Sequence, residues 1–203
     1  MIRLYDYLPS GNGYKVRLLL TQLAIPFERI ELDIIKGETR TPKFLAKFPN
    51  GRIPAVELDD SDGKLLFESN AIITYFADGT SFLSADRFER AQTLQWLFFE
   101  QYSHEPYLAS VRYLVIHPDV QDDRRQILDM MRRRGYEALS VMESHLKSHH
   151  WFVGASYSIA DIALYAYTHV AGEGGFDLSG YPAIKTWLER VRSQPRHIPI
   201  TQS

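Results

Sequence analysis

A single proline, Pro54, constrains the fold of the first part of this chain more than any other residue. It follows Ile53, comes just after a turn at Gly51 and opens an apolar run at Ala55. Because proline has no N–H to donate to a β-ladder, it predicts the beginning, the edge or a bulge of a strand. We expect the Ile53-Pro54 bond to be cis, because the chain passes from a tight turn directly into a strand there. The main-chain N–H and C=O of Ile53 would then face outward and pair with an extended peptide.

The residues before this proline alternate between strand and helix patterns. Residues 1–7 and 28–34 have the two-residue period of a strand, and residues 14–24 have the apolar stripe of a helix. A strand, a helix and a strand of these lengths predict a βαβ unit with parallel strands and a right-handed crossover. Residues 9–13 are predicted to form a loop, because they are turn-forming residues.

A second set of elements completes a thioredoxin-like layout. They are a short helix beginning at Thr41-Pro42, strands at 55–58 and 64–67 around a hairpin turn at 59–63, and a helix at 69–77. The turn-rich segment 78–87 predicts a domain boundary. We therefore expect an α/β domain at 1–78 and an all-helical domain at 86–203.

Two features organise the helical half. Pro106 interrupts the apolar periodicity of residues 88–115 and predicts a kink or a break. Ser158 and Asp161 form a capping-box pattern, in which each side chain accepts from the other residue's backbone N–H. We interpret this box as a folding feature, and we expect Asp161→Ala to cost about 1 kcal/mol or more.

The composition excludes several functions. The 203 residues include no cysteine, so any thiol chemistry must use sulfur brought by a ligand. The seven histidines have no metal-ligand spacing, so we expect no metal site. A net charge of −2 argues against nucleic acid or an anionic membrane as a partner. With neither a signal peptide nor an apolar run that could span a bilayer, the sequence predicts a cytoplasmic location.

Short motifs in a fixed order give the chain a resemblance to a known family. They are SGNGYKVR at 10–17, KGETRTP at 36–42, NGRIPAV at 50–56, ESNAI at 68–72 and SIAD at 158–161. Together they resemble the cytosolic glutathione S-transferases, in particular bacterial members of the serine type, over essentially the whole chain. The resemblance implies a thioredoxin-like domain followed by an all-helical domain, a homodimer, and glutathione as co-substrate.

The resemblance also implies a way to stabilise the thiolate of glutathione. A free thiol has a pKa of about 8.5 and is mostly protonated at neutral pH. Ser10 matches the serine that donates a hydrogen bond to sulfur in serine-type members, and we expect it to do so here. Asn12 is an alternative, since it matches the asparagine of nu-class members and its amide can donate too. Tyr7, near the end of the first strand, is a third candidate.

The other predicted site residues belong to the two substrates. We expect Glu68 to bind the amine of the γ-glutamyl end and Ser69 its carboxylate, because the beginning of a helix favours an anion. The other predicted glutathione contacts are Thr39, Arg40 and Arg52 at the glycine carboxylate, with Lys36 as an alternative cation, and the main chain at Ile53 and Pro54. The predicted site for a small-molecule electrophile comprises Tyr7, Tyr107, Arg112 and Tyr113.

Three functions remain open at this point. The first, which we favour, is transfer of glutathione to a small hydrophobic electrophile in detoxification, with Ser10 stabilising the thiolate. The second is glutathione-dependent reduction of a disulfide or a peroxide, which the pair of Ser10 and Asn12 favours through its similarity to the nu class. The third is a non-catalytic binding or interaction protein with the same fold, against which the intact glutathione motifs argue.

Overall fold

The computed structural model describes residues 1–58 and 63–202, and it divides into two compact units. Unit 1 consists of Met1–Thr80 and Pro195–Ser203, and unit 2 consists of Ser81–Gln194. The sequence pattern predicts one helical domain at 86–203, whereas the structure groups the C-terminal segment with unit 1. Most of the predicted hairpin turn, residues 59–62, lies outside the described residues.

Unit 1 is built on a four-stranded mixed sheet with the order β2-β1-β3-β4. The strands are β1 (Ile2–Asp6), β2 (Phe27–Glu31), β3 (Ala55–Glu57) and β4 (Leu65–Phe67). β1 runs parallel to β2 and antiparallel to β3, and β3 pairs antiparallel with β4. The Ile53-Pro54 bond is cis and directly precedes β3, as the sequence predicts. This sheet confirms the α/β class of the N-terminal region.

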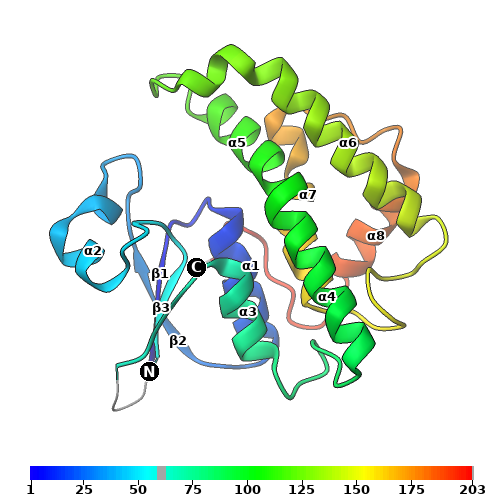
Figure 1. Ribbon diagram of the computed structural model, residues 1–203, viewed down its shortest axis with the longest axis horizontal. Helices are drawn as coiled ribbons and strands as arrows, with labels where there is room; N and C mark the ends of the chain where they lie inside the picture. The colour runs from blue at the N-terminus through cyan, green and yellow to red at the C-terminus, as the bar shows by residue number, and fades with distance from the viewer. Residues whose placement is uncertain (59–62, 203) are drawn as a thin grey trace. The chain divides into compact units, whose positions relative to one another are not determined.

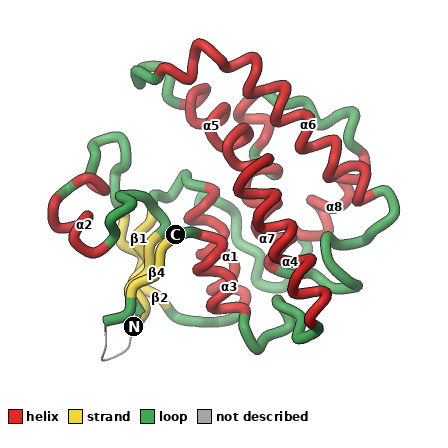
Figure 2. Tube along the Cα trace, viewed as in Figure 1, coloured by secondary structure: helices red, strands yellow, loops and turns green. Residues whose placement is uncertain are grey.

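Helices cover both faces of this sheet (Figures 1 and 2). α1 (Gly11–Gln22) and α3 (Ser69–Ala77) lie side by side on one face. α2 (Pro42–Lys47), which follows the short 3₁₀ helix η1 (Glu38–Arg40), lies on the other face. There the rings of Phe44 and Phe48 pack against Tyr5 of β1, with centroids 5.9 and 5.4 Å from the Tyr5 ring. Aromatic packing therefore holds α2 on the sheet.

The first helix begins earlier than the sequence predicts. The loop predicted at 9–13 is wrong for residues 11–13, which form the first turn of α1 with Ser10 as its N-cap. Gly13 is needed there for close packing, because a Cβ at this position would lie 1.6 Å from Oδ1 of Asp6. The turn-forming residues thus serve a helix cap and a close approach rather than a loop.

Among the described residues of unit 2, the regular elements are all helices, joined by loops and turns, which confirms the all-α class of the C-terminal region. Its α-helices are α4 (Arg87–Phe99), α5 (Glu105–Ile116), α6 (Leu128–Leu146), α7 (Ile159–Thr168) and α8 (Pro182–Arg192). The short helices are the π-helix η2 (Glu100–His104) and the 3₁₀ helices η3 (Asp123–Ile127) and η4 (Ala171–Gly174). Pro106 stands in the first turn of α5, directly after the π-helix that interrupts the predicted long helix.

The predicted capping box is confirmed at the beginning of α7. Oδ2 of Asp161 accepts from the backbone N–H of Ser158 at 3.0 Å. The other carboxylate oxygen, Oδ1, accepts from Nε1 of Trp187 at 2.9 Å and from the backbone N–H of Phe152 at 3.3 Å. The bonds from Trp187 and Phe152 join α7 to α8 and to the segment before α7, and Asp161 is fully buried between them.

This buried carboxylate gives the fold a pH-dependent stability. Burial raises the pKa of Asp161 from 3.8 to about 6, although hydrogen bonds from Trp187, Phe152 and Ser158 lower it. Between pH ~4 and ~6 the folded chain holds a proton that the unfolded chain has released. The free energy of unfolding is therefore expected to fall as the pH rises through this window, by about 3 kcal/mol.

Urea denaturation of the wild type and of Asp161→Asn measures this effect, since the amide does not titrate. We expect the wild type to lose about 3 kcal/mol relative to the variant between pH ~4 and ~7. Curves that stay parallel over this range would contradict the assignment to Asp161.

Candidate functional site

A buried ion pair holds the segment that carries Ser10. Nε of Arg17 in α1 donates to Oδ2 of Asp6 at 2.8 Å, and both side chains are fully buried. Burial raises the pKa of Asp6, and the charge of Arg17 opposes that rise. Nη2 of Arg17 also donates to the carbonyl of Leu8 at 2.8 Å. Arg17 therefore connects the end of β1 to the loop before Ser10.

Ser10, the predicted thiolate donor, is held by its own backbone and side chain. Its N–H donates to the carbonyl of Tyr7 at 2.8 Å, and its Oγ accepts from the N–H of Gly13 at 3.3 Å. A hydroxyl that accepts in this way still carries its own proton, so Ser10 can donate to a ligand atom. The N-terminus of α1 adds positive partial charge at the same place. This geometry suits the stabilisation of an anion.

Asn12 and Ser69 come together although 57 residues separate them. The hydroxyl of Ser69, the first residue of α3, donates to Oδ1 of Asn12 at 3.3 Å. Lys15 is not among the predicted site residues, yet the Nζ of Lys15 donates to Oγ of Ser69 at 3.3 Å. Lys15 is 0% exposed, and Ser69 is 4% exposed. The sequence signal that points to Lys15 is its place in the SGNGYKVR motif, between two apolar residues, Tyr14 and Val16, of the predicted helix.

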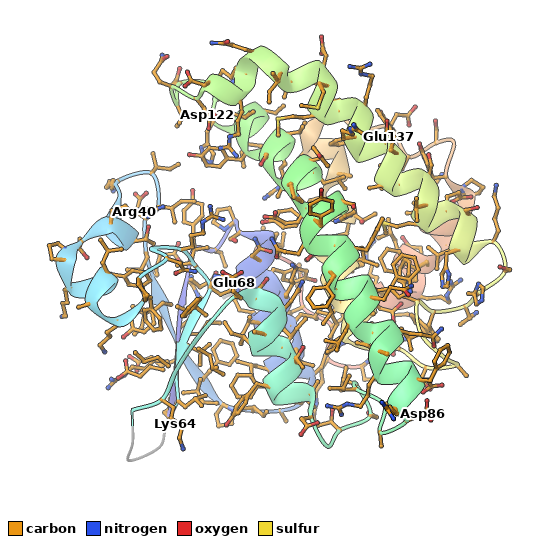
Figure 3. The ribbon with its side chains drawn as sticks, in the orientation of Figure 1. Arg40, Lys64, Glu68, Asp86, Asp122 and Glu137 are labelled. Atoms are coloured by element: carbon orange, nitrogen blue, oxygen red, sulfur yellow. The ribbon has the colours of Figure 1, made fainter. Side chains whose placement is uncertain are left out.

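A second group of polar contacts joins Arg40, Asn50 and Glu68. Nη1 of Arg40 donates to the carbonyl of Asn50 at 3.3 Å, and Nδ2 of Asn50 donates to Oε1 of Glu68 at 3.2 Å. Glu68 has a φ of +68°, which is uncommon for a residue other than glycine. In Figure 3, Glu68 lies at the beginning of α3 and Arg40 lies beside α2. Asn50, which the sequence analysis did not assign, links the two charged residues.

The remaining predicted glutathione contacts lie in the same unit. Thr39 is buried in η1, and Pro54 is buried directly before β3. Arg52 is exposed, and its backbone N–H donates to Oδ1 of Asn50 at 3.3 Å. Lys36, the alternative to Arg40, forms an ion pair with Asp33 at 3.0 Å. Because the charge of Lys36 already has this partner, Arg40 is the better candidate to bind the glycine carboxylate.

Tyr107, a predicted electrophile contact, lines a groove of about 360 Å³ in unit 2. The groove lies among the end of α4, the π-helix, α5 and α6, and its lining includes the aromatic rings of Phe99 and Tyr102. Nη1 of Arg134 and Oε2 of Glu137 form an ion pair at its edge, 2.9 Å apart. Figure 3 labels Glu137 on α6. The groove combines apolar rings with one charged pair.

The other two predicted electrophile contacts have different surroundings. Nη2 of Arg112 lies 2.7 Å from Oε2 of Glu173 in an ion pair. The ring of Tyr113 lies 4.9 Å from that of His117, and the guanidinium of Arg124 lies over it. Within the described residues of unit 2, neither Arg112 nor Tyr113 lines the groove of Tyr107. The structure therefore does not bring these three residues into one pocket.

Two further observations concern metals and membranes. Within residues 1–58 and 63–202, no group of three or more His, Cys, Asp or Glu side chains is arranged to hold a metal ion. Among the same residues, no helix combines the length and the apolar character needed to cross a membrane.

Comparison with known proteins identifies the family. Two family models match the chain: the glutathione S-transferase N-terminal domain over residues 1–78, and the C-terminal domain over residues 98–195. Among curated proteins, the disulfide-bond oxidoreductase YfcG of Escherichia coli (strain K12) is 36% identical over 201 residues. That similarity covers 96% of this chain and 92% of YfcG.

Solved structures have the same fold. The glutathione S-transferase from Pseudomonas fluorescens Pf-5 is 51% identical, with a TM-score of 0.94 over 99% of both chains. The glutathione transferase URE2P6 from Phanerochaete chrysosporium, solved in complex with oxidized glutathione, is 27% identical, with a TM-score of 0.86 over 96% of this chain and 92% of that one. This chain therefore belongs to the glutathione S-transferase family.

Proposed function

We propose that unit 1 binds glutathione and that the chain uses the sulfur of glutathione as its nucleophile. The observation that carries this proposal is the absence of cysteine from a member of the glutathione S-transferase family that is 36% identical to a disulfide-bond oxidoreductase. A protein without a thiol of its own takes part in thiol chemistry only through sulfur that a ligand brings.

In this proposal, Ser10 and Asn12 are catalytic residues that stabilise the thiolate. The hydroxyl of Ser10 and the amide of Asn12 donate to sulfur at the N-terminus of α1. A hydrogen bond to a charged group contributes about 1.5–3 kcal/mol, which corresponds to about one to two pKa units. Such a shift lowers the pKa of the glutathione thiol from ~8.5 towards neutral pH.

Charged side chains and main-chain pairing hold the rest of the tripeptide. Glu68, oriented by Asn50, binds the amine of the γ-glutamyl end. The backbone N–H groups at the N-terminus of α3, including that of Ser69, bind its carboxylate, because the Ser69 hydroxyl donates to Asn12. The proposed contacts at the other end are Thr39, Arg40 and Arg52 for the glycine carboxylate, and the main chain of Ile53 beside Pro54 for the peptide backbone.

The first proposed reaction is reduction of a disulfide. The bound thiolate attacks one sulfur of the disulfide, the S–S bond breaks, and the other sulfur leaves as a thiolate that takes up a proton. The thiolate of a second glutathione then attacks the glutathione sulfur of the mixed disulfide. Two glutathiones are oxidised to glutathione disulfide, and the substrate is reduced to two thiols. The identity to YfcG, a disulfide-bond oxidoreductase, favours this reaction.

The second candidate reaction is conjugation, in which the same thiolate attacks an electrophilic carbon and the leaving group departs. The 51% identity to a glutathione S-transferase from Pseudomonas fluorescens favours it. The electrophile contacts remain a prediction: Tyr107, Arg112 and Tyr113 in the helical region, and Tyr7 in unit 1.

We also propose a cytoplasmic homodimer, as the family resemblance implies. Light scattering would measure the mass of this dimer.

Substitution of the two catalytic residues tests this proposal. We expect Ser10→Ala and Asn12→Ala each to raise the pKa of bound glutathione by about one unit, because each removes one donor to sulfur. Turnover below that pKa should fall about tenfold, with little change in glutathione affinity. Thiolate absorbance against pH reports the pKa, calorimetry reports the affinity, and a panel of disulfide, peroxide, aryl halide and epoxide substrates reports turnover.

Ser193→Ala, which changes an exposed serine of unit 2, is the matched control and should leave all three quantities unchanged. A shift in Asn12→Ala without one in Ser10→Ala would leave Asn12 as the catalytic residue and remove Ser10 from that role. Absence of glutathione binding by the wild type would overturn the proposed function. Binding without turnover of any substrate would favour the non-catalytic alternative.

A further inference from the structure

Lys15 occupies a position that is expensive for a lysine. Its side chain is 0% exposed and extends from α1 to the beginning of α3. Two of the atoms to which its ammonium donates are neutral oxygens: Oγ of Ser69 at 3.3 Å and Oδ1 of Asn70 at 3.4 Å. Burial of an ammonium group is unfavourable, and buried lysines are rare for that reason.

Stabilisation of α3 does not account for this lysine. The N-terminus of a helix carries positive partial charge, so a cation beside it is repelled, whereas an anion is attracted. Lys15 nevertheless reaches the first residue of α3. A buried ammonium and a helix N-terminus together create positive potential, which suits the anionic groups of glutathione under the proposed function.

The hydrogen bonds around Lys15 have a defined direction. An ammonium group only donates, so Oγ of Ser69 is the acceptor of the bond from Lys15. The hydroxyl of Ser69 therefore keeps its own proton and donates it to Oδ1 of Asn12, which lies 3.3 Å away. The chain of donors runs from Lys15 through Ser69 to Asn12.

This direction decides which end of the Asn12 amide is held. Because Oδ1 accepts from Ser69, the carbonyl end of the amide faces α3. The NH2 end, which is the only end that can donate to a thiolate, then points away from Ser69. A rotation of the amide by 180° would present the carbonyl oxygen to sulfur and repel the anion.

We propose that Lys15 is a positioning residue that acts through Ser69 to keep the NH2 group of Asn12 directed at the sulfur of glutathione. This inference rests on the proposed function, in which Asn12 donates to the thiolate. Without the ammonium, the hydroxyl of Ser69 is free to turn, and the amide of Asn12 loses its fixed orientation.

A double-mutant cycle on the full-length protein tests the inference, with the pKa of bound glutathione as the readout. Lys15→Met, which keeps most of the side-chain volume, is expected to raise this pKa by about one unit. In the Asn12→Ala background, Lys15→Met should add no further shift, because the group that it positions is already absent. Ser69→Ala breaks the same chain and should raise the pKa as Lys15→Met does, which provides a second variant if Lys15→Met does not fold.

Lys47→Met is the matched control and should leave the thiol pKa unchanged. Lys47 lies in the same unit, where it pairs with Glu57 at 2.8 Å. An unchanged pKa in both Lys15→Met and Ser69→Ala would overturn the inference. An equal shift with and without Asn12 would also overturn it, because Lys15 would then act directly through its charge. Failure of the wild type to bind glutathione is a different result, since it removes the proposed function itself.

Discussion

Replacement of Arg17 by methionine is expected to lower the free energy of unfolding by about 3–5 kcal/mol. The substitution leaves the carboxylate of Asp6 buried without the cation that lies 2.8 Å from it. A buried charge that loses its partner is among the most destabilising changes in a protein. Arg17 also donates to three backbone carbonyls, which would lose these bonds: those of Leu8, Ile200 and Gln202.

Urea denaturation followed by circular dichroism measures this loss. Arg192→Met is the matched control, because Arg192 is 71% exposed and lies 4.0 Å from Glu189, so its loss should cost under ~1 kcal/mol. The double variant Asp6→Asn, Arg17→Met removes both charges and should recover part of the stability. If Arg17→Met proved as stable as Arg192→Met, that result would contradict the role of this ion pair.

Asp161→Ala is expected to lower the free energy of unfolding by about 3 kcal/mol or more at neutral pH. The substitution removes the acceptor of four buried donors: Nε1 of Trp187, the hydroxyl of Ser158, and the backbone N–H groups of Ser158 and Phe152. A buried donor without an acceptor costs about 1–3 kcal/mol. Loss of the cap alone would cost about 1 kcal/mol, so the larger value reflects the links to Trp187 and Phe152.

Thermal and urea unfolding of Asp161→Ala measure the loss, with Asp177→Ala as the matched control. Asp177 accepts from Ser179 at an exposed turn, so its removal should change stability by less than ~1 kcal/mol. A loss for Asp161→Ala near 1 kcal/mol would mean that the capping bond is the only one that matters.

Local patterns predicted much of the fold. The parallel pair of β1 and β2, the cis Ile53-Pro54 bond and the capping box of Ser158 agree with the sequence analysis. Each depends on residues within a few positions of one another, or on a period that runs along one element. The same local reasoning failed at residues 11–13, because turn-forming residues also suit a capped helix that packs closely against Asp6.

The candidate site was harder to predict in full. Ser10, Asn12 and Ser69 were assigned from motifs, whereas Asn50 and Lys15 were not. Their contacts to Glu68 and Ser69 join residues that are 18 and 54 positions apart. A long-range hydrogen bond of this kind leaves no periodic trace in the sequence.

By itself, the sequence determined the order of strands and helices, the family motifs and the absence of any cysteine, because these depend on residue identity and on neighbours along the chain. Only the tertiary structure decided that Lys15, Ser69 and Asn12 share one line of hydrogen bonds, and that the C-terminal segment joins unit 1. The physical reason is that both results depend on how distant elements pack: α3 against α1 in the first case, and the last residues against Arg17 in the second.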